Sequence, residues 1–315
     1  MAKQAEQDQQ TAPAGQVGFI GLGTMGGPMA RNLAARLGAE SGMWVFDTSP
    51  HALDDIKTMH GVHVASAPRE IAETCNIIIT CLPDDAAVEA VYRGPQGISG
   101  ALRKGLTTLD CSTVSPGLTG ELEAQWRKAG AQHLTAPMLG SKAQSEAGQI
   151  FFILGGALPG VRDITPYLSM MGRMHIFVGD AVTASKIKLL HNALGAVNYA
   201  AVAEALGLCV TAGVDLKTFY DVVRNGGGMA FGNYFDRKVP SIIDGDYSPR
   251  FKLALAHKDH MLARGFISGV HMETPILDAA RDMLEGALAE GHGDEDASTV
   301  TRVMEHRLRT TISKK

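Results

Sequence analysis

Short apolar runs alternate with helix-like stretches along the first part of the chain. The runs are rich in β-branched side chains and lie at residues 17–20, 43–46, 62–64, 76–82, 106–112 and 151–156. The helix-like stretches between them lie at residues 25–38, 51–60, 84–92 and 116–130. Strands and helices that alternate in this way predict a parallel sheet with helices on both faces.

After a last strand-like run at residues 174–180, the pattern is helical to the end of the chain. The first helix is expected from Thr183 to Ala212, with Thr183 as its N-cap and Gly213 just beyond its end. It would be roughly 45 Å long and apolar on nearly every side. Polar residues such as His191 interrupt it, and its flanks lack the charge asymmetry of a membrane span. We interpret it as a core helix, packed between domains or against a second subunit.

Length and composition support two domains. The chain has 315 residues, which is too many for one ordinary core. Hydrophobic residues make up 45% and charged residues 20%, a balance that suits a soluble globular protein. The predicted fold class is α/β, with a doubly wound sheet in residues 16–180 and an all-helical domain in residues 181–315. Residues 1–15 are polar and lack the apolar core of a signal peptide, so we interpret them as a disordered tail of a cytoplasmic protein.

Charge and cysteine content narrow the choice of partners. A formal net charge of −4 gives no basic field of the kind that recruits nucleic acid or anionic lipid, so we expect no nucleic-acid or membrane binding. The four cysteines show no C-x-x-C pairing and are typical of buried free thiols in a reducing compartment. No metal site is expected. The partner implied is a small molecule.

The first predicted strand leads directly into the glycine pattern G-x-G-x-x-G. Gly21 permits a tight turn, Gly23 lets the backbone approach a pyrophosphate, and Gly26 lets the next helix pack closely on the strand. The unpaired N–H groups and the dipole at that helix N-terminus favour an anion. The pattern therefore predicts a Rossmann domain that binds a dinucleotide. The loop residues expected at the cofactor are Gly21, Leu22, Gly23, Thr24, Met25 and Gly26.

Asp47 follows the second predicted strand, about 20 residues beyond the glycines, where such domains hold the adenosine ribose. A carboxylate there accepts hydrogen bonds from the ribose diol and repels a 2′-phosphate, and no Arg or Lys follows before Lys57. NAD is therefore expected in preference to NADP. The alternative for Asp47 is a turn or N-cap residue, because residues 47–50 also have turn composition.

Five segments, in their order and spacing, resemble the β-hydroxyacid dehydrogenases. They are GFIGLGTMGGPMARNL (18–33), LDCSTVSPG (109–117), APMLGSKAQSEAGQ (136–149), KLLHN (188–192) and FKLALAHKDHMLA (251–263). The resemblance extends from Gln16 to about Met304. The family includes 3-hydroxyisobutyrate dehydrogenase, tartronate semialdehyde reductase and the glyoxylate/succinic semialdehyde reductases.

The resemblance implies that Lys188 handles the proton of the substrate hydroxyl and that Asn192 helps to hold the substrate. Residues i and i+4 share one helix face, so this pair is geometrically consistent. Lys186 cannot share that face, and we assign it to the solvated side in preference to a cofactor phosphate. Without the resemblance, a lysine with a solvated head group is the ordinary interpretation of Lys188.

Ser112 and Thr113 follow a predicted strand, at the edge where open α/β sheets bind ligands. The resemblance implies that Ser112 binds the substrate carboxylate. An N-cap role is the alternative, but Ser115 suits that role better. Gly140 and Ser141 are expected to offer backbone N–H groups to the carboxylate.

Two residues depart from the family pattern. Leu139 stands where the family usually has a serine, so a hydroxyl donor is lost and the pocket becomes more apolar. His191 stands where an asparagine is common. It either reaches Lys188 and modulates its proton exchange or satisfies a buried polar contact, and we prefer the second interpretation.

Further contacts follow from the resemblance. Phe231 lies where the family closes its substrate pocket, although both Phe231 and Phe235 have the alternative of being core aromatics. His257 and His260 lack a third ligand, so we interpret them as helix-surface histidines. The acidic residues 292–298 are interpreted as a capping turn before the last helix. The residues implied at the cofactor outside the glycine loop are Asp47, Leu82, Pro83, Ser112 and Lys258.

The sequence thus predicts an NAD-dependent dehydrogenase or reductase of a small hydroxy acid or aldehyde acid that bears a carboxylate, with Lys188 as general acid/base. The long apolar helix implies a homodimer or homotetramer. Two alternatives remain open. The first is an imine reductase of the same fold, which typically has Asp or Tyr in place of the lysine. The second is a non-catalytic NAD-binding oligomerisation module, which has lost the lysine.

Overall fold

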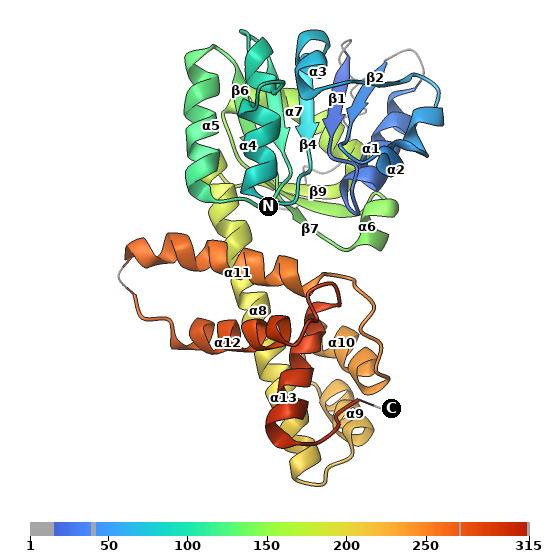
Figure 1. Ribbon diagram of the computed structural model, residues 1–315, viewed down its shortest axis with the longest axis vertical. Coiled ribbons are helices and arrows are strands. Elements are labelled where there is room, and N and C mark those ends of the chain that lie inside the picture. Colours follow the sequence, from blue (N-terminus) through green and yellow to red (C-terminus); the bar gives the residue numbers. More distant parts are fainter. Residues whose placement is uncertain (1–15, 39–41, 271, 314–315) are drawn as a thin grey trace. The chain divides into compact units, whose positions relative to one another are not determined.

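The computed structural model describes residues 16–38, 42–270 and 272–313. These residues form two compact units, which divide within one helix between Lys188 and Leu189. The tail predicted at residues 1–15 lies outside the described residues. Figure 1 shows a sheet flanked by helices in the first unit and helices alone in the second.

The first unit contains a six-stranded parallel sheet in the order β3-β2-β1-β4-β5-β6. This order is that of the Rossmann fold, so the predicted fold class is confirmed. The chain reverses its direction of winding between β1 and β4, the point at which such sheets bind ligands. The strands are β1 (Val17–Ile20), β2 (Met43–Phe46), β3 (Val62–Val64), β4 (Ile77–Thr80), β5 (Thr107–Asp110) and β6 (Gln132–Thr135).

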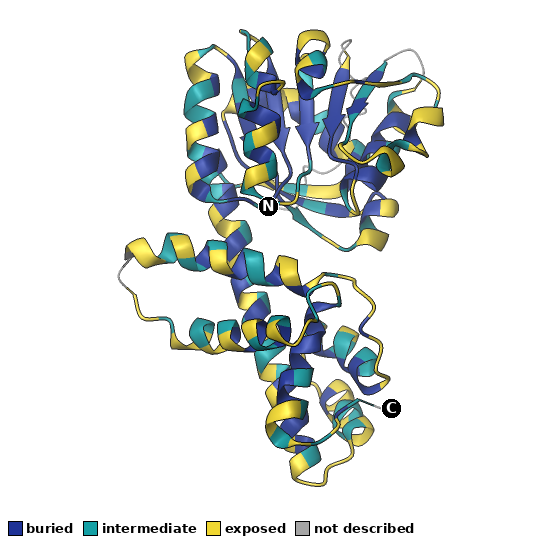
Figure 2. Cartoon of the chain, in the orientation of Figure 1, coloured by how far each residue is buried: buried dark blue, intermediate teal, exposed yellow. Residues whose placement is uncertain are grey.

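Helices cover both faces of this sheet because alternate strand residues point to opposite sides. Phe19 and Ile79 join one apolar cluster with α1 (Gly26–Leu37) and α7 (Leu158–Met171). Their neighbours Ile20 and Ile78 join a second cluster on the opposite face. The central strands β1, β4 and β5 are mostly dark in Figure 2, which marks them as buried. The helices of the second cluster are α3 (Pro68–Thr74), α4 (Asp85–Arg93) and α5 (Pro116–Lys128).

A separate three-stranded sheet in the order β7-β8-β9 departs from the predicted single sheet. The run predicted at residues 151–156 forms part of β8 (Ile150–Leu154), which pairs antiparallel with β7 (Met138–Leu139) and parallel with β9 (Gly172–Phe177). The helix expected at residues 51–60 is broken. The short helices in this unit are α2 (Pro50–Leu53), η1 (Ile56–Thr58), η2 (Ile98–Ala101) and α6 (Lys142–Glu146).

The predicted long helix is α8 (Ala181–Thr211), which begins two residues before the expected start. Asp180 Oδ1 accepts a hydrogen bond from the Thr183 N–H at 2.7 Å, so Asp180 caps the first turn and the N-cap role expected of Thr183 is wrong. Gly213 has a φ of 71°, the left-handed conformation typical of a residue that follows a helix.

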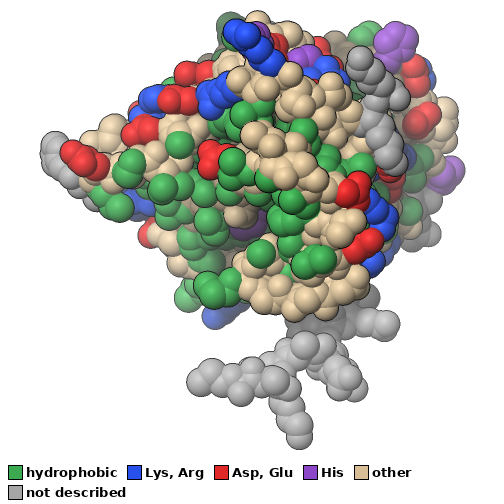
Figure 3. Space-filling view, turned by 90° about the horizontal axis from the view of Figure 1, so that it is seen from below, with side chains coloured by type: hydrophobic (Ala, Val, Ile, Leu, Met, Phe, Trp, Pro, Cys, Tyr) green, Lys and Arg blue, Asp and Glu red, His purple; other side chains and the backbone are tan. Residues whose placement is uncertain are grey.

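In the second unit, α8 packs its small and branched side chains into the core. Leu189, Ala193, Ala203 and Leu206 are at most 2% exposed, whereas Leu194 is 63% exposed. Among the described helices, α8 is long and apolar enough to cross a membrane by length and composition alone, a test that core helices of soluble proteins also pass. Figure 3 shows hydrophobic side chains exposed over much of one face of the chain. The other helices are α9 (Leu216–Gly226), α10 (Asn233–Ile243), α11 (Leu253–Ile267), η3 (Ser268–Val270), α12 (Pro275–Ala289), η4 (Ala297–Thr299) and α13 (Val300–Leu308).

The capping turn predicted at residues 292–298 is confirmed, and its main residue is Asp296. The Asp296 side chain caps η4 by accepting from the Ser298 N–H, immediately before α13. It is 2% exposed and also accepts from the backbone N–H groups of Arg250 and Phe251, while Lys238 Nζ lies 2.6 Å away. One buried carboxylate therefore joins three segments of the second unit.

The cysteines are free, as predicted. Cys75, Cys111 and Cys209 are buried, and Cys81 is partly exposed. Burial raises the pKa of the Cys75 and Cys81 thiols to about 12, and it also raises that of Cys111.

Candidate functional site

The glycine loop joins β1 to α1 at the carboxyl edge of the large sheet. Gly21 has a φ of 93°, and a Cβ there would lie 2.3 Å from the Cys81 carbonyl oxygen. A Cβ at Gly26 would lie 2.0 Å from the Gly21 carbonyl oxygen. At Gly23, which is exposed, a Cβ would meet no described atom within 4 Å. This open space at the N-terminus of α1, where the helix dipole favours an anion, fits the pyrophosphate of a dinucleotide; the Gly27 N–H there donates to the Gly23 carbonyl oxygen at 2.9 Å.

Asp47 connects the end of β2 to the glycine loop. Its Oδ2 accepts a hydrogen bond from the Leu22 N–H at 2.7 Å, and its Oδ1 accepts one from the Ser49 N–H at 2.7 Å. The turn role considered as an alternative is therefore present. Each carboxylate oxygen can accept a second hydrogen bond, so the side chain still has lone pairs for a ribose diol.

Ser112 follows the carboxyl end of β5, but the residue is only 3% exposed, and its hydroxyl has partners within the protein. Ser112 Oγ donates to Asp110 Oδ1 at 2.5 Å and accepts from the Leu82 N–H at 2.9 Å. Thr113 is partly exposed. Ser115 caps α5 by accepting from the Leu118 N–H, as the sequence predicted, with Pro116 as the first helical residue.

Lys188 reaches the segment that precedes Gly140 and Ser141. Its Nζ donates to the Met138 carbonyl oxygen at 2.7 Å, and the residue is partly buried. Ser141 is the N-cap of α6, and its N–H donates to Gln144 Oε1 at 2.9 Å. Lys188 therefore lies next to this segment. A ligand carboxylate that binds the Ser141 N–H would have to displace the Gln144 side chain, which already accepts from it.

In the second unit, a buried carboxylate joins two of the residues predicted at the site. Asn192 Nδ2 donates to Asp259 Oδ2 at 2.6 Å, and Lys258 Nζ lies 3.0 Å from Asp259 Oδ1. Because the Asp259 carboxylate only accepts hydrogen bonds, the NH₂ group of the Asn192 amide faces Asp259 and the amide oxygen of Asn192 points away from it. That oxygen lies 3.1 Å from His191 Nδ1, and His191 is exposed. The buried contact expected of His191 is therefore wrong, because its helix position faces outward.

Other predicted positions divide between surface and core. Lys186 is exposed, in agreement with its assignment to the solvated side. Phe235 is a core residue at 5% exposure, whereas Phe231 is 41% exposed in the loop after α9. His260 is fully buried, so its interpretation as a helix-surface residue is wrong, and burial lowers its pKa. Within the described residues, no group of three or more His, Cys, Asp or Glu side chains could hold a metal ion.

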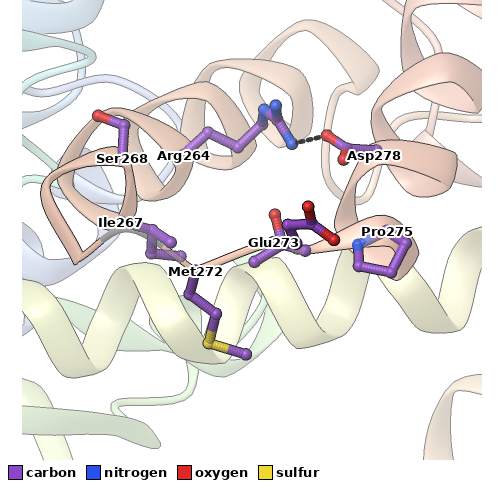
Figure 4. A pocket seen from close by; sticks show the side chains of 8 residues that line it. Arg264, Ile267, Ser268, Met272, Glu273, Pro275 and Asp278 are labelled. Atoms are coloured by element: carbon purple, nitrogen blue, oxygen red, sulfur yellow. Dashed lines mark hydrogen bonds and ion pairs between the residues drawn. The ribbon is translucent and has the colours of Figure 1, made fainter.

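A pocket of about 440 Å³ lies between the end of α11 and the start of α12. Figure 4 shows the Arg264 guanidinium and the Asp278 carboxylate, which both line the pocket and form an ion pair. Met272 and Ile267 supply apolar lining. None of the residues predicted at the cofactor or substrate lines this pocket, so it is distinct from the candidate site.

Comparisons with known proteins agree with this arrangement. The family model described as the NAD binding domain of 6-phosphogluconate dehydrogenase matches residues 16–179. The model described as "NAD-binding of NADP-dependent 3-hydroxyisobutyrate dehydrogenase" matches residues 183–304. A 2-(hydroxymethyl)glutarate dehydrogenase from Eubacterium barkeri is 31% identical over 95% of this chain and 97% of its own length. The chloroplastic glyoxylate/succinic semialdehyde reductase 2 of Arabidopsis thaliana is 31% identical over 91% of this chain and 79% of its own length.

A solved structure extends the agreement to three dimensions. The Mycobacterium tuberculosis 3-hydroxyisobutyrate dehydrogenase, determined with L-serine, aligns with a TM-score of 0.81 and 27% identity over 92% of this chain and 99% of that one. A dinucleotide-binding sheet followed by a helical unit, together with these relatives, places the chain in the class of NAD(P)-dependent oxidoreductases. The chain belongs to the β-hydroxyacid dehydrogenase family. Its relatives support NAD(P)-dependent hydroxyacid dehydrogenase activity with a nicotinamide dinucleotide as cofactor.

Proposed function

We propose that this protein transfers hydride between NAD(H) and a small hydroxy acid or aldehyde acid, with Lys188 as the general acid/base. The observation that carries the proposal is the position of Lys188, whose ammonium is held 2.7 Å from the Met138 carbonyl oxygen beside Gly140 and Ser141. A flexible lysine held at that place can give a proton to a carbonyl oxygen or take one from a hydroxyl. The nicotinamide, when bound, supplies or accepts the hydride.

The chain's own residues would position the substrate. Asn192 follows Lys188 by one turn of α8, and its amide orientation is fixed by Asp259. Thr113 and the backbone of Gly140 are the remaining polar groups expected at the substrate carboxylate. The dehydrogenases and reductases named among the relatives act on compounds of this kind, which supports a small carboxylate as substrate.

The proposal is tested by following NADH absorbance with a panel of small carbonyl acids. The panel contains glyoxylate, succinic semialdehyde, tartronate semialdehyde and, in the oxidative direction, 3-hydroxyisobutyrate with NAD. We expect turnover with at least one member. No turnover with any of them, at cofactor concentrations that saturate the protein, would contradict the proposal and favour the non-catalytic alternative.

Cofactor preference is expected to depend on Asp47. Its carboxylate lies at the glycine loop, where its charge would repel the 2′-phosphate of NADPH. Asp47→Asn keeps an oxygen for the Leu22 N–H but removes the charge. We expect the ratio of kcat/KM for NADPH to that for NADH to rise by about tenfold, which corresponds to about 1.4 kcal/mol.

The matched control is Asp55→Asn, which removes an exposed acid a few residues further along the chain. It should leave the cofactor ratio within about twofold, because a solvated charge away from the loop is largely screened. An unchanged ratio in Asp47→Asn would remove the basis for preferring NAD.

We also propose that the protein self-associates through α8. Large apolar side chains of this helix remain exposed within one chain, and a second copy would cover them. They are Ile187, Leu190, Leu194 and Leu208.

A further inference from the structure

A buried carboxylate in the first unit has no role among the predicted site residues. Asp110, the last residue of β5, is 1% exposed. Its Oδ1 accepts three hydrogen bonds, from the Ser112 N–H at 3.0 Å, from Ser112 Oγ at 2.5 Å and from Thr80 Oγ1 at 2.9 Å. None of the ion pairs among the described residues includes it. Burial without a cation raises its pKa, an effect that the donors from Ser112 and Thr80 partly offset.

The direction of the hydrogen bonds around Ser112 follows from elementary valence. The Leu82 N–H can only donate, so Ser112 Oγ accepts there at 2.9 Å. The single hydroxyl proton of Ser112 is then directed at Asp110. The serine that the resemblance assigned to a substrate carboxylate therefore has its proton committed inside the protein.

The same hydrogen bonds join two loops at the carboxyl edge of the sheet. β4 and β5 are parallel neighbours in register, with Thr80 opposite Asp110. The loop after β4 begins with Cys81 and Leu82, and the loop after β5 contains Ser112. The Ser112 hydroxyl thus donates to Asp110, the last residue of β5, and accepts from the Leu82 backbone N–H in the neighbouring loop.

We propose that Asp110 is a positioning residue for the cofactor, which acts through the Ser112 hydroxyl to fix the Leu82 backbone at the edge where the dinucleotide binds. The proposal rests on the proposed function in that it places the cofactor at this edge. Asp110 itself touches neither cofactor nor substrate. Without its acceptor, the Ser112 hydroxyl is free to rotate, and the Leu82 N–H loses an oriented partner.

The test is a double-mutant cycle on NADH affinity, measured by fluorescence titration of the full chain. Ser112→Ala removes the link and should raise the Kd about tenfold. Asp110→Asn replaces a carboxylate with a weaker neutral acceptor and should raise the Kd several-fold. If Asp110 acts through Ser112, the double variant should bind NADH no more weakly than Ser112→Ala.

Thr80→Val is the matched control, because it removes another donor to the same Asp110 oxygen without touching Ser112. It should lower the melting temperature but leave the Kd for NADH within about twofold. Two outcomes would overturn the proposal: effects of Asp110→Asn and Ser112→Ala that multiply in the double variant, or a Kd in Thr80→Val raised as much as in Ser112→Ala. If Asp110→Asn does not fold, the comparison of Ser112→Ala with Thr80→Val still decides.

Failure of this proposal is distinguishable from failure of the proposed function. A wild-type chain that does not bind NADH contradicts the function itself. A wild-type chain that binds NADH and turns over substrate, with unchanged affinity in Ser112→Ala, contradicts only the positioning role of Asp110.

Discussion

Lys188→Ala is expected to lower kcat by about 10³-fold while NADH still binds. General acid/base groups contribute about 10² to 10⁴ to enzymatic rates, and an alanine offers no proton in their place. The lysine donates to the Met138 carbonyl oxygen, which lies outside the glycine loop, so we expect the Kd for NADH to stay within about threefold. Stopped-flow measurement of NADH oxidation gives the rate, and fluorescence titration gives the affinity.

Lys186→Ala is the control for this prediction, since Lys186 is a lysine on the same helix with an exposed side chain. It should retain near-normal turnover. Lys188→Arg adds a sharper variant: it keeps the positive charge, but a guanidinium does not give up its proton in proteins, so this variant should also be inactive. Near-normal activity in Lys188→Ala or Lys188→Arg would contradict proton transfer by this residue.

Asp296→Ala is expected to lower the stability of the helical unit by about 3 to 5 kcal/mol. Removing one partner of a buried ion pair leaves the other charge uncompensated. Here the partner is Lys238, and the backbone N–H groups of Arg250 and Phe251 also lose their acceptor. The urea midpoint followed by far-UV circular dichroism measures the loss, because the signal comes mainly from helices.

Asp294→Ala is the matched control. Asp294 also pairs with a lysine, Lys252 at 2.8 Å, but its side chain is 93% exposed. Water and salt screen an exposed pair, so it contributes little to stability and the midpoint should move little. Equal shifts of the urea midpoint in the two variants would contradict the prediction that the buried ion pair stabilises the fold more than the exposed one.

The contribution of Asp296 should also depend on pH. Burial raises the pKa of this carboxyl, but the hydrogen bond and charge of Lys238 and the donors of Ser298 outweigh burial and leave the pKa below its usual value. A carboxyl with a depressed folded-state pKa stabilises the fold above its unfolded pKa of about 3.9, and that contribution is lost as pH falls through the folded pKa. The difference in stability between wild type and Asp296→Ala should therefore be constant from about pH 8 to 5 and shrink below about pH 4.

The sequence was most informative where strands are buried on both faces. Such strands are nearly continuous apolar runs, which is why β1, β2 and β4 and the glycine loop between β1 and α1 were predictable. β6 was missed because it contains Gln132 and His133. His133 is buried, its Nδ1 lies 2.9 Å from Thr108 Oγ1, and burial lowers its pKa to about 3, so it occupies a core position as a neutral ring.

Helix α7 was missed for a different reason. It contains Pro166 and the pair Pro159 and Gly160, residues that usually indicate a break. Gly160 is required by packing, since a Cβ there would lie 2.6 Å from the amide oxygen of Gln132. A close approach between a helix and a strand distant in sequence is not visible in the local pattern.

At the candidate site, residue types were predictable but their hydrogen-bond partners were not. The spacing of Lys188 and Asn192 on one helix could be seen in the sequence, whereas the commitment of the Ser112 proton to Asp110 could not. The available signal for Asp110 was an acid at the end of a buried strand. Its importance depends on the neighbouring strand and the Leu82 amide, which only the folded structure brings together.

The raised pKa values of the thiols have a practical consequence for labelling. Alkylating reagents and maleimides react with the thiolate, and Cys75, Cys81 and Cys111 hold their protons well above neutral pH. In the folded chain these native sulfurs react slowly. A cysteine introduced at an exposed position of either unit would therefore be the preferred attachment point for a fluorescent or spin label, with the native residues left in place.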